Sequence, residues 1–156
     1  MALRNLTYGL FVITARELEK DNGHIANTAF QVGANPTRIA ISVQTGNLNK
    51  ELIEKSGKFN VNVLTESVPF ETIRHFGMQS GRDVDKFADF VGFGRSHNGL
   101  TYLTDHTNAM FSCEVKEKID LGSHMLFIGE VTESKVLGKG ASCPSAHYHK
   151  AIKPKF

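Results

Sequence analysis

Residues 109–119, AMFSCEVKEKI, and residues 124–131, HMLFIGEV, decide the fold class of this chain. The first segment alternates apolar and polar residues, which is the pattern of a strand with one buried face. The second is apolar on both faces as far as Ile128, which indicates a central strand or one buried at a subunit interface. Together they predict a domain built mainly from β-strands.

Four further segments carry strand patterns, at residues 7–14, 24–32, 38–44 and 59–64. In the last of these, Asn60 and Asn62 are expected on the face opposite the core. The remaining chain has few helical signals.

Two short helices are expected, over residues 47–57 with Asn47 as N-cap and over residues 69–77. Scattered glycines in 89–105 predict a loop with at most one short strand. The expected fold is therefore all-β, a barrel or sandwich with two or three small helices.

The composition fits one folded domain spanning residues 1–156. The 18 Lys and Arg residues are interspersed with 16 Asp and Glu residues, which disfavours a nucleic-acid-binding protein. No apolar run approaches the ~18 residues of a membrane span, and no signal peptide is expected, so a cytoplasmic location is favoured. Two cysteines cannot form a disulfide framework; Cys113 is expected in the core and Cys143 at the surface.

Several common nucleotide and metal motifs are absent from the sequence. It contains no GxGxxG, no GxxxxGK[ST], no HExxH and no GxSxG pattern. No histidine or cysteine spacing suggests a metal site. A bound nucleotide would therefore lie against a β-barrel surface.

The segment TGNLNK (45–50) is a candidate anion site. A strand ends, Gly46 permits a turn and a helix begins, so unpaired N–H groups at the helix start favour a phosphate. Asn49 and Lys50 would supply further donors. The alternative is an ordinary capped helix with an exposed lysine.

Two other segments also admit a functional and a structural interpretation. In residues 23–32, polar Asn27 and Thr28 interrupt an apolar strand, and the small Ala26 would let a flat ring approach the backbone; otherwise this is a strand with one solvated face. In residues 80–87, Arg82 could grip a phosphate; otherwise this is a solvated charged loop.

Taken in order, HIANTAFQV (24–32), TGNLNKEL (45–52), SGRDVDKF (80–87) and SHMLFIGEV (123–131) resemble one known family. This is the flavin reductase-like, FMN-binding split-barrel family, which includes flavoredoxin and the flavin domain of high-molecular-weight rubredoxins. The resemblance covers about residues 3–138.

The resemblance implies a Greek-key split β-barrel that forms a homodimer with FMN bound near the dimer interface. It places Ala26, Asn27 and Thr28 along the flavin ring. The phosphate would be held by Thr45, Asn47, Leu48 and Asn49, with Ser80, Gly81, Arg82 and Lys86 closing over the same end. His124 would lie next to the nicotinamide site.

The activity implied is an NAD(P)H:flavin oxidoreductase that passes electrons to flavin, ferric iron, oxygen or a separate acceptor protein such as rubredoxin. The choice between NADH and NADPH stays open. A flavoredoxin-type electron carrier reduced by a protein partner is the alternative, and a flavin-free binding barrel is a third possibility.

Overall fold

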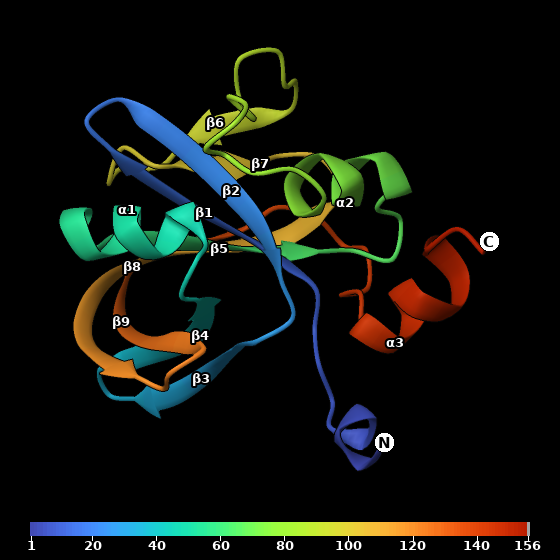
Figure 1. Ribbon diagram of the computed structural model, residues 1–156, viewed down its shortest axis with the longest axis horizontal. Helices are drawn as coiled ribbons and strands as arrows, with labels where there is room; N and C mark the ends of the chain where they lie inside the picture. The colour runs from blue at the N-terminus through green and yellow to red at the C-terminus, as the bar shows by residue number, and fades with distance from the viewer. Residues whose placement is uncertain (156) are drawn as a thin grey trace.

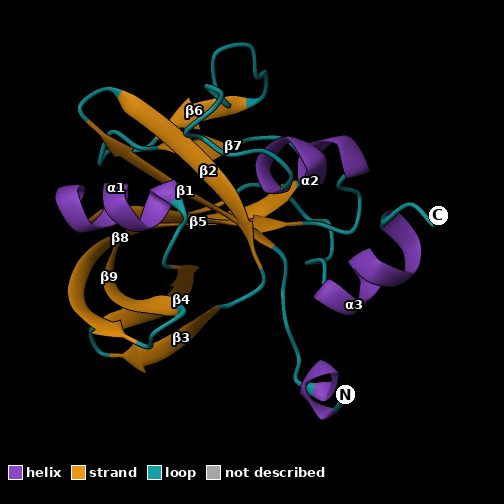
Figure 2. Cartoon of the chain, viewed as in Figure 1, coloured by secondary structure: helices purple, strands orange, loops and turns teal. Residues whose placement is uncertain are grey.

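A seven-stranded antiparallel sheet forms the body of the protein in the computed structural model, which describes residues 1–155. The strand order is β2-β1-β5-β8-β9-β4-β3. The large strands are β1 (Phe11–Glu17), β2 (Lys20–Ala26), β3 (Ala29–Ala34), β4 (Thr37–Gln44), β5 (Lys58–Leu64), β8 (Thr107–Asp120) and β9 (His124–Val136). β6 (Phe93–Arg95) and β7 (Thr101–Leu103) form a separate hairpin. Figure 2 shows how far strands dominate the chain.

The sheet curves around one apolar cluster, and helix α1 (Leu48–Ser56) lies against it (Figure 1). Leu52 and Ile53 of α1 are buried there with Ile13, Ile41 and Phe127 from three strands. Asn47 caps the helix by accepting a hydrogen bond from the Asn49 amide, and the helix ends before Gly57 at φ 73°. The expectation of a capped helix over 47–57 is confirmed.

A second apolar cluster lies where helix α2 (Phe70–Gly77) covers β2. It contains Phe76 and Phe87, and Tyr148 joins it from the C-terminal segment. That segment comprises α3 (Ser145–His147) and a π-helical turn (Tyr148–Ile152), and a 3-10 turn (Ala2–Asn5) opens the chain. No helix among residues 1–155 is long and apolar enough to cross a membrane.

The β5 asparagines correct one expectation, since both Asn60 and Asn62 are fully buried. The β6–β7 hairpin covers the face that they occupy, and their amides bond to it. Asn60 donates to the Thr101 carbonyl at 3.0 Å, and Asn62 accepts from the Leu103 amide at 3.0 Å. Buried amides are tolerated where such hydrogen bonds satisfy them.

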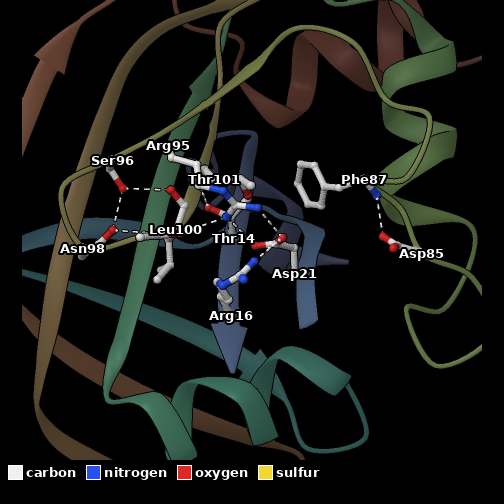
Figure 3. Close-up of polar contacts among 11 residues, drawn as sticks. Thr14, Arg16, Asp21, Asp85, Phe87, Arg95, Ser96, Asn98, Leu100 and Thr101 are labelled. Atoms are coloured by element: carbon white, nitrogen blue, oxygen red, sulfur yellow. Dashed lines mark hydrogen bonds and ion pairs between the residues drawn. The ribbon is translucent and has the colours of Figure 1, made fainter. Parts of the chain in front are cut away.

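A carboxylate fastens the same hairpin to the β1–β2 edge. Asp21 accepts from Arg16 at 2.7 Å and from Arg95 at 2.8 and 3.0 Å (Figure 3). The hairpin was expected to be a loop with at most one short strand; its two strands of three residues were too short to show a periodic pattern.

Two further expectations are wrong. Residues 24–32 are divided between β2 and β3, which lie at opposite edges of the sheet, and the break falls at Asn27 and Thr28. Cys143 is buried within the second cluster, not exposed, and burial raises the pKa of its thiol.

Candidate functional site

Two adjoining cavities form one cleft between β2, β4 and the start of α1. The larger has a volume of about 570 Å³ and the smaller about 320 Å³. Four residues line both, namely His24, Ile25, Gln44 and Asn47. The cleft is therefore continuous across this junction.

The larger cavity is enclosed by the beginning of α1 and by the segment that follows α2. Gly46, Asn47 and Leu48 contribute from the α1 side, where the helix start presents its positive dipole end. Ser80 and Gly81 contribute from the opposite side. The backbone of Gly81 packs so close to Asn22 that a Cβ on Gly81 would overlap its side chain.

Lys86 supplies a buried positive charge to this cavity. Its side-chain nitrogen Nζ donates to the carbonyl oxygens of Gly23 and Phe76, each at 2.8 Å. Within residues 1–155 it forms no ion pair. Burial, with a smaller contribution from Lys20, lowers the pKa of Lys86 to about 8. An ammonium group without a carboxylate partner would be stabilised by an anion in the cavity.

The imidazole of His24 lies where the two cavities meet. Its Nδ1 is 2.7 Å from the Asn49 side-chain nitrogen Nδ2, and the Asn49 Oδ1 in turn accepts from Asn22 at 3.1 Å. Burial, with a smaller contribution from the charge of Lys86, lowers the pKa of His24 to about 3, so the ring is neutral.

The smaller cavity leads from this junction to His124, at the start of β9. Ala26 and Asn27 line it from the end of β2, and Ser42 lines it from β4. The C-terminal segment closes one side with Ser145, Tyr148 and His149. The His124 Nδ1 lies 2.8 Å from the Ser123 hydroxyl oxygen, which holds the ring at the cavity.

Most residues expected at a site are thus brought together by the fold. The cleft is lined by Ala26, Asn27, Asn47, Leu48, Ser80, Gly81, Lys86 and His124.

The remaining expected residues have other contacts. Thr28 donates to the Asn27 side chain, and Thr45 donates to the Gly122 carbonyl. Lys50 pairs with Glu54 at 2.9 Å. The Asn49 side chain is fully buried behind the cavity wall, where it bonds to His24.

Arg82 lies at the rim of the larger cavity, outside its lining. Its Nη2 is 2.9 Å from Glu51 Oε1 and 3.4 Å from the Gly46 carbonyl oxygen. The side chain is nearly half exposed, and the Glu51 carboxylate raises the pKa of the guanidinium. Arg82 therefore spans from the loop to the α1 side of the cleft.

His24, Asn22 and Gln44 were not singled out from the sequence. The available signal was the polar pair Asn22 and His24 within strand-forming surroundings, since such residues are rarely buried without a partner.

The sequence matches the family described as Flavin reductase like domain over residues 3–154. It is 43% identical over 148 residues to the high molecular weight rubredoxin of Moorella thermoacetica, covering 95% of this chain and 64% of that protein. It is 32% identical to the ferric-chelate reductase (NAD(P)H) of Archaeoglobus fulgidus, covering 95% of this chain and 87% of that protein.

A solved flavin reductase in its native state has the same fold, with a TM-score of 0.74 and 31% identity. The match covers 86% of this chain and 83% of that one. The chain spans slightly less than two thirds of the length of the rubredoxin relative.

Proposed function

Because the chain belongs to the flavin reductase like domain family, we propose that it binds FMN and acts as an NAD(P)H:flavin oxidoreductase. The single observation that carries this proposal is the continuous cleft, which has a cation and a helix start at one end and His124 at the other. FMN has a matching order of parts, with an anionic phosphate at one end, a polar sugar chain in the middle and a largely apolar ring at the other end.

The larger cavity fits the phosphate. Lys86 is a buried cation that forms no ion pair within the described chain, and the start of α1 adds its positive dipole end. Ser80 adds a hydroxyl group, and Gly81 lets the backbone come close. Arg82 is near enough to the Gly46 carbonyl to close over the rim once a phosphate competes with Glu51.

The smaller cavity fits the ring and the nicotinamide. Ala26 is small and leaves space along β2, and Asn27 offers an amide to a polar ring edge. His124 would lie beside the nicotinamide, where its ring restricts how the second nucleotide enters. A bound flavin supplies hydride-acceptor chemistry, and the protein supplies binding and orientation.

A homodimer of split Greek-key barrels belongs to the same proposal. An apolar groove of about 200 Å³ opens beside the first apolar cluster and is lined among others by Phe11, Phe30, Val63 and Phe111. Phe30 is 53% exposed at this groove. A second copy of this chain would cover it.

The electron acceptor is proposed to be a separate molecule: free flavin, ferric iron, oxygen or a protein. Two relatives carry names that contain rubredoxin and ferric-chelate reductase, which supports a one-electron acceptor. A protein acceptor of the rubredoxin kind would bind this chain as a separate partner.

Anaerobic stopped-flow mixing of the FMN-loaded protein with NADH and with NADPH tests the activity. We expect the flavin absorbance near 450 nm to bleach with at least one nucleotide. Failure with both, with FMN still bound, would contradict the reductase and favour the flavoredoxin-type carrier. A protein that takes up no FMN would contradict both and favour a flavin-free barrel.

A further inference from the structure

The protonation of His24 is fixed by a chain of buried hydrogen bonds. The imidazole is 7% exposed, and its Nδ1 lies 2.7 Å from Asn49 Nδ2. Which of the two nitrogens donates depends on how the Asn49 amide is oriented.

The Ile13 carbonyl settles that orientation. It can only accept a hydrogen bond, and it lies 2.9 Å from the same Asn49 Nδ2. The Asn49 oxygen therefore points the other way, where it accepts from Asn22 at 3.1 Å. One Asn49 N–H is used by Ile13, and the other points at His24.

His24 Nδ1 must consequently accept a hydrogen bond, so the neutral ring carries its proton on Nε2. A second proton on Nδ1 would face the Asn49 N–H group, donor against donor. Lys86, whose Nζ donates to the Gly23 carbonyl beside His24, opposes protonation of the ring as well. The donor geometry at Nδ1, together with burial, therefore favours the neutral ring.

The Nε2–H group has no hydrogen-bond partner within residues 1–155, and the ring lines both cavities. We propose that His24 is a hydrogen-bond donor to the flavin, held in its Nε2–H form by Asn49 and Asn22. This inference rests on the proposed function and adds to it a residue, a tautomer and a ligand atom type.

The ligand atom would be an uncharged oxygen acceptor between the phosphate and the ring edge, either a sugar-chain hydroxyl or a ring carbonyl. His24 lies at the junction of the cavities, whereas Lys86 contacts only the larger one. His24 should therefore contribute equally to the binding of FMN and of riboflavin, which lacks the phosphate.

The tautomer is tested without any ligand. Long-range ¹H–¹⁵N NMR spectra of the histidine side chains should show His24 protonated on Nε2 alone, with no titration between pH 5 and pH 9. A proton on Nδ1, or titration near pH 6.5, would overturn the inference.

The matched Asn49→Asp variant, which replaces the donor by an acceptor, should move the proton to Nδ1 and make His24 titrate. An unchanged His24 spectrum in that variant would also overturn it.

The binding role is tested by fluorescence titration of His24→Phe with FMN and with riboflavin. We expect both dissociation constants to rise about tenfold, because the ligand acceptor loses its buried partner. His97→Ala is the control, since that side chain is 90% exposed and lines neither cavity. Unchanged constants in His24→Phe would overturn the binding role alone. Failure of the wild-type protein to bind either flavin would instead contradict the proposed function.

Discussion

Lys86 Nζ lies 2.8 Å from the carbonyl oxygen of Gly23, the residue that directly precedes His24. The charged Lys86 ammonium and the neutral His24 ring therefore lie on the wall of the same cleft. The charged group faces the larger cavity only, whereas the neutral ring faces both. In the proposed complex with FMN, this arrangement would separate recognition of the phosphate from recognition of the rest of the ligand.

The first prediction concerns pH. Because the pKa of Lys86 in the free protein is lowered to about 8, its positive charge is present below that pH and is lost above it. FMN affinity should therefore be nearly level up to about pH 7 and should fall as the pH rises through 8 and beyond. Riboflavin affinity should not change over this range, since riboflavin has no phosphate. Lys86→Met should weaken FMN binding at pH 7 and abolish the pH dependence; a pH profile identical to that of the wild type would place the phosphate elsewhere.

The second prediction concerns Arg82 and Glu51, which are paired at 2.9 Å at the rim of the cleft. Arg82→Ala should raise the dissociation constant for FMN several-fold, because the guanidinium can no longer reach the phosphate. Glu51→Gln should leave it unchanged or lower it, because Arg82 is released from its competitor. Equilibrium titration measures both. An Arg82→Ala protein with wild-type affinity would remove this residue from the site.

The third prediction concerns His124. His124→Ala should bind FMN normally but should be reduced by the nicotinamide nucleotide roughly tenfold more slowly, the scale of one lost hydrogen bond. Anaerobic stopped-flow absorbance provides the rate. Equal rates in the variant and the wild type would mean that His124 lies outside the nicotinamide site.

The fourth prediction concerns the close contact at Gly81. Gly81→Ala should lower the free energy of unfolding by about 1–3 kcal/mol, because the added methyl group overlaps the Asn22 side chain. Gly46→Ala is the control, since nothing lies within 4 Å of a Cβ at that position. Urea denaturation of the apoprotein measures both. Equal stability of the two variants would contradict the packing described at Gly81.

The fifth prediction concerns the apolar groove. Phe30→Glu should convert a dimer to a monomer in sedimentation velocity, because a carboxylate would be buried in an apolar interface. Val91→Glu, at an exposed loop position outside the groove, should leave the dimer intact. A wild-type protein that sediments as a monomer would contradict the proposed homodimer.

The sequence patterns correctly predicted those elements whose structure depends mainly on the residues within them. Strand β4, helix α1 and the central position of β9 follow from alternation, a cap and a two-sided apolar run. Position in the chain could not reveal that Asn60 and Asn62 are covered, because the covering hairpin lies more than thirty residues away. Their burial depends on the tertiary structure, which the periodicity of a single strand does not report.

The residues of the candidate site also fall into those that local sequence patterns reveal and those that depend on distant residues. Backbone-defined features, such as the start of α1 and Gly81, were visible as motifs. His24 was not, since its importance depends on Asn49, a residue 25 positions away. Asn49 itself was expected to face the phosphate, yet its side chain turns inward because Ile13 and His24 occupy its amide.

The central claim, that the two cavities together hold one FMN molecule, is tested most directly by a crystal structure of the protein grown with FMN. The phosphate should lie within hydrogen-bond distance of Lys86 Nζ, with the ring toward His124 and a flavin oxygen on His24 Nε2. A flavin bound elsewhere, or bound with its ring in the larger cavity, would contradict the account.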